Sequence, residues 1–175
     1  MHCTEASSET ELLAILLSDA RQRASFLGNR RAWLAQKLQD PGTAGHLLDL
    51  DAVQLESQAA TLVGKRWRAV SELIPESSLG NSSLTAALFR EYADQYWPEG
   101  HRRHELDAVS FLRFCRGLGL RISTAELARL EISLGQRSFS LLPVRLQCGR
   151  RRKFGILLLI RGSGRNCREL LLSHI

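Results

Sequence analysis

Two histidines, an aspartate and a cysteine lie near one another in the sequence and have the side chains of a metal site. His101 and His104 are three residues apart, Asp107 follows three residues later, and Cys115 lies further along the chain. Imidazole, carboxylate and thiolate groups are all zinc ligands. The segment begins in a loop or a first helical turn, however, where Asp107 can pair with Arg103 and His104 can pack at a helix start. We favour this structural interpretation and assign no metal ligand to the chain.

The cysteines and the sequence motifs give no sign of catalysis. The four cysteines form no CxxC pair, and no HExxH, GxSxG, P-loop or GxGxxG motif occurs. Cys115 lies on an apolar helical stripe, which is typical of a buried side chain. Cys148 and Cys167 flank two basic turns and could approach each other across the C-terminal strands, although free thiols are expected in a reducing compartment. We therefore predict no catalytic residue, and an enzyme acting alone is an unattractive interpretation.

The strongest chemical signal is a run of four positive charges on a turn, Arg150 to Lys153. Residues 132–175 contain nine Arg or Lys residues and one Glu, a net charge of +8, so residues 1–131 carry −2 of the total of +6. A basic turn can hold the acidic side chains of a peptide or the phosphates of a nucleic acid. It can also be a solvated face that aids solubility. The charge alone leaves these three interpretations open.

The length, the N-terminus and the hydropathy of the chain limit the class of protein. At 175 residues the chain is one domain or two small ones, and it is short for a catalytic fold that carries its own cofactor. The first residues lack the basic, apolar and small-residue segments of a signal peptide. No apolar run approaches the roughly 20 residues that cross a bilayer. We therefore expect a cytoplasmic protein with no membrane partner.

Helical periodicity dominates the sequence up to residue 135 and predicts about six helices. A capping-box signal at Ser8–Glu11 opens the first helix. Apolar residues at spacings of three, four or seven between Leu48 and Leu73 give the clearest pattern in the chain, and Pro75 ends that helix. The predicted helices cover residues 8–27, a short segment around 33–38, 48–74, 84–96, 105–116 and 124–134.

After Gly135 the pattern changes from helices to strands. Residues 138–147, 153–161 and 166–173 have the composition of three strands, joined by Gly-Arg-Arg-Arg and Gly-Ser-Gly turns. The predicted fold class is therefore α+β. A helical body over residues 1–135 carries a basic three-stranded antiparallel meander over residues 136–175, docked on it as one compact unit. Because residues 154–160 lack polar alternation, we expect both faces of the middle strand to be covered.

Two binding modes suit this architecture. Helices followed by a basic hairpin resemble a winged helix in outline, but none of the helices is strongly basic with base-reading residues on one face. An extended peptide can instead add to an exposed strand edge. Pro143 lacks an N–H and blunts the first edge strand, so we predict that the peptide adds to the last strand. The predicted peptide-binding residues are Arg150, Arg151, Arg152, Lys153, Arg165, Arg168, Leu170 and Leu171.

Packing motifs over residues 48–172 carry a resemblance to a known family. They are Leu50–Ala59, Leu62–Arg66, Leu73–Pro75, Phe89–Ala93, Asp107–Phe111 and Glu126–Glu131, together with the arginine-rich strand pair. In these segments the chain resembles the TglI-like small partner proteins of multinuclear non-haem iron oxidative enzymes. Those partner proteins serve the biosynthesis of ribosomally made, post-translationally modified peptides. None of the matching motifs is catalytic.

The resemblance implies that peptide binding and catalysis reside in two different proteins. This chain would hold no cofactor, would bind the leader of a precursor peptide and would dock on the iron enzyme. The enzyme would hold the metal and modify a cysteine in the core peptide. Related proteins carry an older description as DNA-binding domains. We therefore predict a non-catalytic partner subunit that presents a precursor peptide to an iron-dependent oxidative enzyme, with a DNA-binding regulator as the alternative.

Overall fold

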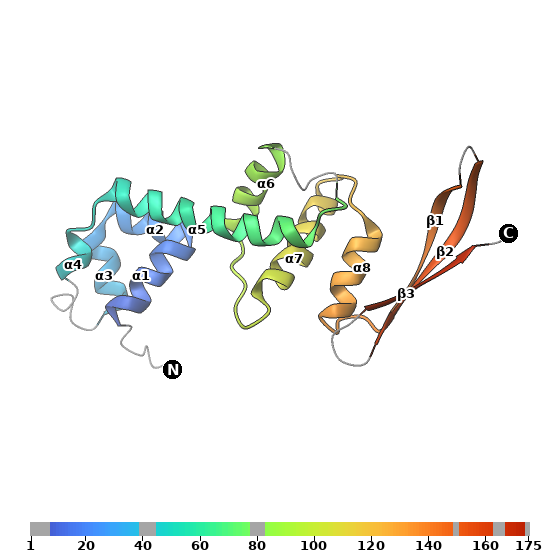
Figure 1. Ribbon diagram of the computed structural model, residues 1–175. Helices are drawn as coiled ribbons and strands as arrows, with labels where there is room; N and C mark the ends of the chain where they lie inside the picture. Colours follow the sequence, from blue (N-terminus) through green and yellow to red (C-terminus); the bar gives the residue numbers. More distant parts are fainter. Residues whose placement is uncertain (1–7, 39–44, 78–82, 149–150, 163–166, 174–175) are drawn as a thin grey trace. The chain divides into compact units, whose positions relative to one another are not determined.

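The computed structural model describes residues 8–38, 45–77, 83–148, 151–162 and 167–173. Within this part of the chain eight helices are followed by three strands (Figure 1), which confirms the α+β class and the C-terminal antiparallel meander. None of the helices described is both long enough and apolar enough to cross a membrane. The chain divides into two compact units, residues 1–68 with 89–97 and residues 69–88 with 98–175. The division does not fall at residue 135, since the last helix and the sheet belong to the same unit.

The first unit is built from short N-terminal helices. They are α1 Glu9–Ser18, α2 Ala20–Gly28, α3 Arg30–Lys37, α4 Gly45–Leu48 and the first part of α5 Ala52–Leu73. The capping box predicted at Ser8 and Glu11 is confirmed. The single helix predicted over residues 8–27 is wrong, because the Asp19 carboxylate accepts hydrogen bonds from the N–H groups of Arg21 and Gln22, at 2.8 and 3.0 Å. Asp19 thereby caps α2 in an extended conformation that ends α1.

An apolar core and a buried arginine stabilise the first unit. The core side chains are Leu12, Leu16, Phe26, Trp33, Leu34, Leu47 and Leu55. The Arg66 guanidinium lies 4.3 Å from the ring centroid of Trp97 and 5.5 Å from that of Phe89, and it donates a hydrogen bond to the Tyr96 carbonyl at 3.0 Å. These contacts offset part of the cost of burying the charge. The helical pattern of residues 48–73 does not predict this burial.

The second unit joins the ends of two shared helices to α7, α8 and the sheet. The shared helices are α5 and α6 Ser83–Ala93, and the others are α7 Arg103–Gly117 and α8 Thr124–Ser133. α7 buries Asp107, Ala108, Val109, Phe111, Leu112 and Cys115. Glu131 of α8 lies 2.8 Å from Arg113 of α7 and 3.1 Å from Arg137, which follows α8. One carboxylate therefore links α7, α8 and the segment that leads into the sheet.

Gly135 turns the chain from α8 toward the sheet. Its φ of +76° lies in the left-handed region, which glycine adopts without steric cost. A Cβ at this position would lie 3.0 Å from the Arg161 guanidinium. The Arg161 N–H also donates a hydrogen bond to the Ser138 carbonyl at 2.9 Å. The turn at Gly135 is thus held against the end of the middle strand.

Three antiparallel strands form the sheet in the order β1-β2-β3. β1 is Phe139–Cys148, β2 is Arg151–Arg161 and β3 is Cys167–Ser173. Leu142 pairs with Leu157, which pairs in turn with Leu171, so these three residues and every second residue from them share one face. The central position of β2 leaves β1 and β3 as the two edges, as the sequence predicts.

The register separates two cysteines that the sequence pattern brings near each other. Cys148 pairs with Arg151 and Cys167 pairs with Arg161, at opposite ends of β2. Ten residues of strand span roughly 33 Å. Cys148 and Cys167 of one chain therefore cannot form a disulfide, and the expectation that they could approach each other is wrong.

Only one face of the sheet is covered by a described element. Ala128 and Ile132 of α8 pack against Leu157 and Leu159 of β2. Figure 1 shows α8 next to the sheet. On the opposite face of β2, the Phe154 side chain is 71% exposed. The prediction that both faces of the middle strand are covered is wrong, because α8 is a single helix of 10 residues and reaches one face.

Candidate functional site

Three of the eight predicted peptide-binding residues lie on the outer strand of the sheet. Arg168, Leu170 and Leu171 belong to β3, and all three side chains are exposed. By the register, Arg168 and Leu170 lie on one face, whereas Leu171 lies on the face that α8 covers in part. Both faces meet at the edge of β3. A strand added at this edge would therefore have all three side chains as neighbours.

The other five predicted residues do not join them in one cluster. Arg150 and Arg165 lie outside the described residues. Arg151, Arg152 and Lys153 begin β2, where they pair with residues 148, 147 and 146 of β1, and their side chains lie outside the described part. Arg168 pairs with Ile160, near the other end of β2. The predicted set is thus spread along the whole length of the sheet.

The edge of β3 is the better template for an additional strand. β3 is 7 residues long and pairs with β2 on one side. Its other side borders no strand of the described structure, so alternate N–H and C=O groups there are open to pairing. On the opposite edge, Pro143 of β1 lies opposite Ile156 and has no N–H to donate.

A pocket of about 450 Å³ lies where β2 ends and β3 begins. It is lined by Ile160, Arg161, Gly162, Arg168 and Leu170. Arginine side chains bind carboxylates through charge-assisted hydrogen bonds, and the apolar residues add a surface for a neighbouring aliphatic group. This end of β3 suits an acidic side chain next to an apolar one.

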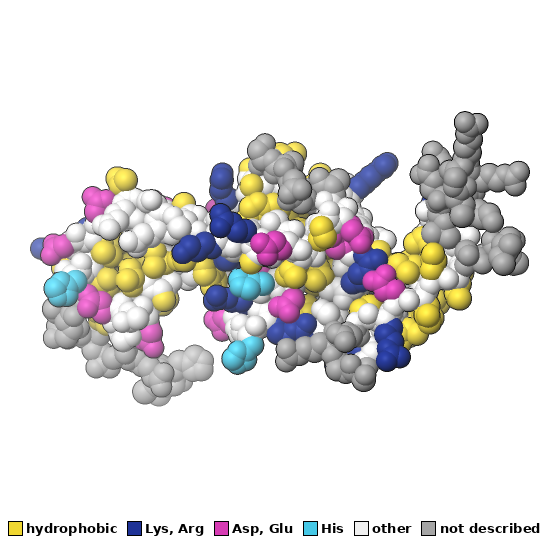
Figure 2. Space-filling model, in the orientation of Figure 1, with side chains coloured by type: hydrophobic (Ala, Val, Ile, Leu, Met, Phe, Trp, Pro, Cys, Tyr) yellow, Lys and Arg dark blue, Asp and Glu magenta, His cyan; other side chains and the backbone are white. Residues whose placement is uncertain are grey.

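One face of the sheet, here called the open face, is largely apolar and exposed. In β1, β2 and β3 it presents Phe139, Leu141, Phe154, Ile156, Ile160, Leu170 and Leu172, whose exposed fractions range from 36% to 71%. Hydrophobic side chains are visible over the strands in Figure 2. The sequence did not predict this surface, because apolar residues occur at positions of both faces of β1 and β3. A patch of this kind on a protein surface is typical of an interaction site.

The described charges of the open face are positive. Arg145 of β1 lies over the Phe154 ring, with its guanidinium 5.7 Å from the ring centroid. Arg168 of β3 pairs with Ile160 on the same face. Glu169, the acidic residue of β3, lies on the other face, because it pairs with the buried Leu159. The described part of the open face therefore combines apolar area with arginine.

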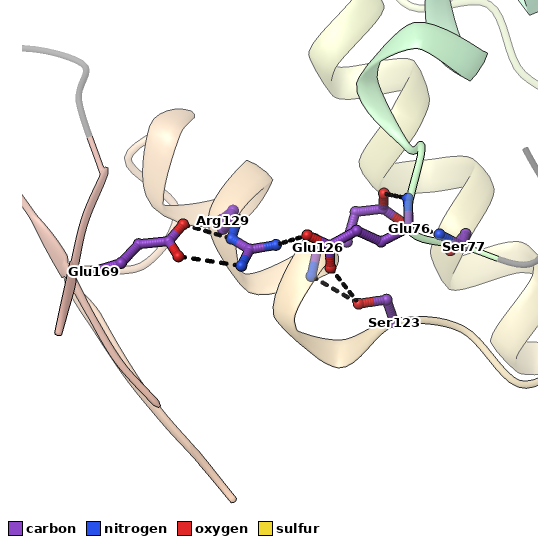
Figure 3. A network of polar contacts seen from close by, with 6 residues as sticks. All are labelled: Glu76, Ser77, Ser123, Glu126, Arg129 and Glu169. Carbon is purple, nitrogen blue, oxygen red and sulfur yellow. Dashed lines mark hydrogen bonds and ion pairs between the residues drawn. The ribbon is translucent and has the colours of Figure 1, made fainter. Parts of the chain in front are cut away.

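A charged network ties β3 to α8 (Figure 3). Arg129 of α8 binds Glu169 of β3 through two hydrogen bonds, Nε to Oε1 at 2.6 Å and Nη2 to Oε2 at 3.2 Å. It also forms an ion pair with Glu76, which follows α5. The hydrogen bonds to Glu169, followed by the charges of both carboxylates, raise the pKa of Arg129, which stays charged. Glu169 thus anchors β3 and is not free to meet a ligand at the edge.

A buried carboxylate continues this network under α8. Glu126 accepts hydrogen bonds from the N–H groups of Glu76 and Ser77, at 2.7 and 3.0 Å (Figure 3). Ser123 caps α8 by accepting a hydrogen bond from the Glu126 N–H at 3.2 Å. The adjoining pocket of about 280 Å³ is lined by Leu73, Pro75, Glu76, Glu126, Arg129, Leu130, Ser133 and Cys167. These contacts hold the segment after α5 against α8 and are structural.

The described thiols are poor nucleophiles. Burial raises the pKa of the Cys115 thiol to about 11. Burial, followed by the nearby Glu169 carboxylate, also raises the pKa of Cys167. The thiolate is the nucleophilic form of cysteine, so a raised pKa lowers its reactivity at neutral pH. As predicted from its apolar stripe, Cys115 is a core residue, with 0% exposure.

The residues considered as metal ligands do not gather around a common point in the described structure. Asp107 is buried in α7, His101 is exposed before that helix, and Cys115 lies in the core. Across the described ranges, no group of three or more His, Cys, Asp or Glu residues could hold a metal ion.

Comparison with known proteins identifies no relative. No protein-family model matches the chain, and comparisons with curated proteins and with solved structures find no match. The resemblance to the TglI-like partner proteins therefore stays a prediction from the sequence. The features of the structure that bear on function are the edge of β3, the open face and the charges beside them.

Proposed function

We propose that the chain is a non-catalytic partner subunit that binds the leader of a ribosomally made precursor peptide. It presents that peptide to an iron-dependent oxidative enzyme, which modifies a cysteine. The observation that carries peptide recognition is the exposed edge of β3, flanked by Arg168, Leu170 and Leu171. The enzyme partner and its iron follow from the resemblance over residues 48–172.

The leader adds to β3 as a fourth strand in this proposal. Main-chain hydrogen bonds then supply affinity, and the side chains of the added strand alternate between the two faces. On the open face they lie beside Leu170 and Leu172, and on the other face beside Leu171. At the pocket beside Gly162, Arg168 holds an acidic side chain. The edge therefore favours a leader in which apolar and acidic residues alternate.

Strand addition also explains how the peptide is presented. β3 has 7 residues, so it pairs with a leader segment of similar length. The core peptide, which carries the cysteine, then extends beyond the sheet and is free to enter the active site of another protein. Binding through the main chain leaves the cysteine side chain without a contact to this chain.

The alternative, a DNA-binding regulator, predicts a different ligand for the same basic segment. Phosphate contacts need exposed positive charge and little apolar surface. The described part of the open face carries arginines among exposed Leu, Ile and Phe side chains, a combination that favours a peptide. The two functions are separated by removing the charges of Arg150–Lys153.

The test changes all four residues of Arg150–Lys153 to Ser. The charge-matched control changes four exposed helical residues, Arg31, Lys65, Arg103 and Arg116, to Ser. Residues 151–153 precede Gly155, which pairs with Ser173 at the end of β3, so a leader that runs past this end of β3 approaches the basic segment. Each lost ion pair should then weaken binding of a labelled leader by roughly 0.2–1 kcal/mol, an effect that fades with added salt. The control should bind as the parent does. If the Arg150–Lys153 variant keeps its leader affinity but loses retention of promoter DNA in a gel-shift assay, the DNA-binding regulator is the better account of the chain's function.

A further inference from the structure

The exposed apolar area of the open face is somewhat larger than the largest patch on a typical monomer. At roughly 200 Å² for a fully exposed side chain of this size, about half exposure of seven such side chains leaves roughly 700 Å² of surface. The largest apolar patch on a typical monomer covers about 300–600 Å². Each partner in a standard protein–protein interface buries about 800 Å². The open face has the size of an interface with a folded protein, and an added strand at the β3 edge would cover only its margin.

The positive charge beside the open face favours an acidic protein partner over a second copy of this chain. Among the residues whose side chains the structure describes, Arg145 and Arg168 are the charged residues of the open face, and residues 132–175 carry a net charge of +8. A second copy docked face to face would bring arginines toward arginines, and like charges at an interface are unfavourable. A surface bordered by Asp and Glu residues would pair with them instead.

A membrane surface is also a poor match for the open face. Insertion into lipid would bring the edges of β1 and β3 to the hydrocarbon region. Each unpaired N–H or C=O group costs several kcal/mol there, which is why sheets with open edges do not enter bilayers. A protein partner can leave the edges in water or pair with them.

We propose that the open face docks a second protein through an apolar surface bordered by carboxylates. This inference rests on the proposed function only for the identity of that protein, which is the iron enzyme of the complex. The chain then has two binding surfaces, the edge of β3 for the peptide and the open face for the partner.

Two adjacent leucines allow a matched test of the face. Leu170 and Leu171 are both 52% exposed, but they lie on opposite faces of β3. The binding probe is a synthetic amphipathic helix with a leucine stripe bordered by Glu, and its counterpart has Lys in place of Glu. Fluorescence anisotropy should show at least tenfold tighter binding of the Glu helix to the parent. Leu170→Ser should weaken that binding about fivefold or more, and Leu171→Ser should change it less than twofold.

A second open-face variant, Phe154→Ser, should behave as Leu170→Ser does, with circular dichroism confirming the fold of each. The inference is overturned if the Glu helix does not bind, if it has no advantage over the Lys helix, or if Leu171→Ser weakens it equally. Concentration-dependent dimers in sedimentation velocity that Leu170→Ser abolishes would assign the face to a second copy. Binding to phosphatidylglycerol vesicles that Leu170→Ser abolishes would assign it to lipid. None of these outcomes depends on the leader, so peptide binding at the edge is judged separately.

Discussion

Proline placed along β3 should weaken leader binding at every second position. Successive N–H groups of a strand point alternately to its two sides, so those of Arg168, Glu169, Leu170 and Leu171 point in turn toward β2 and toward the open edge. A proline has no N–H and removes one hydrogen bond wherever it stands. At outward positions the lost bond is one to the leader. At inward positions it is one that holds β3 to β2.

The size of each effect follows from the value of one main-chain hydrogen bond. A net contribution of about 0.5–1.5 kcal/mol corresponds to roughly a two- to tenfold loss of leader affinity at an outward position. The unfolding free energy should change little there. At an inward position the fold should lose about 1 kcal/mol or more, because the ladder is broken and the ring is crowded against β2. The two sets of positions are therefore controls for each other.

The assay is fluorescence anisotropy with a labelled leader of the Cys-containing precursor that the proposed function requires. Single prolines are scanned from Arg168 to Leu171, and circular dichroism identifies variants that unfold. Prolines at Ser140 and Leu142 of β1 serve as controls on the opposite edge and should leave affinity unchanged. If every folded β3 variant binds as the parent does while a β1 variant binds more weakly, the leader does not add to β3.

Three further predictions concern the elements that support the sheet. Gly135→Ala should lower the free energy of unfolding by about 1–3 kcal/mol, because the backbone φ is left-handed and the added Cβ would crowd the Arg161 guanidinium. An unchanged midpoint in urea denaturation would contradict this prediction. Glu169→Gln should lower the free energy of unfolding by about 0.5–1 kcal/mol, because it removes the ion pair with Arg129. This difference from the parent should disappear in high salt. A loss of stability that does not depend on salt would indicate a packing effect. The pKa of Cys115 is raised from 9.0 to about 11, so its contribution to stability should be complete below pH 9 and lost as the pH rises to about 11. Cys115→Ala should remove the loss of stability between pH 9 and 11. If parent and variant show the same dependence of unfolding free energy on pH, Cys115 does not cause that loss.

Local signals in the sequence predict the elements of this fold but not their partners. Pro75 and Gly135 mark the ends of α5 and α8 to within two residues, because each acts on the backbone of its own segment. The glycine-containing segments likewise predict where the strands are divided, and residues 149–150 and 163–166 between the strands lie outside the described part. Asp19 gives no such local signal, since an aspartate inside an apolar helical pattern can be either a surface residue or a cap. Only its hydrogen bonds to the next turn decide between the two.

The sequence predicts only part of the candidate site, because its signals are local. An edge strand follows from the order of three strands in a meander, and Pro143 indicates which edge is blunted. The open face does not follow, because an apolar run such as residues 154–160 does not show which of its faces has a partner. Contacts between distant residues are also hidden from local patterns. Arg129 and Glu169 are 40 residues apart, and Arg66 and Tyr96 are 30 apart.

The most direct test of the proposed function is reconstitution of the reaction from purified parts. The precursor is incubated with this chain, with the iron enzyme, or with both, and the mass of its core cysteine segment is followed by mass spectrometry. We expect conversion only with both proteins, and none for a core peptide without its leader. The chain alone should bind no stoichiometric iron or zinc. Equal conversion by the enzyme without this chain would contradict the account, as would tight metal binding by the isolated chain that His101→Ala and His104→Ala abolish.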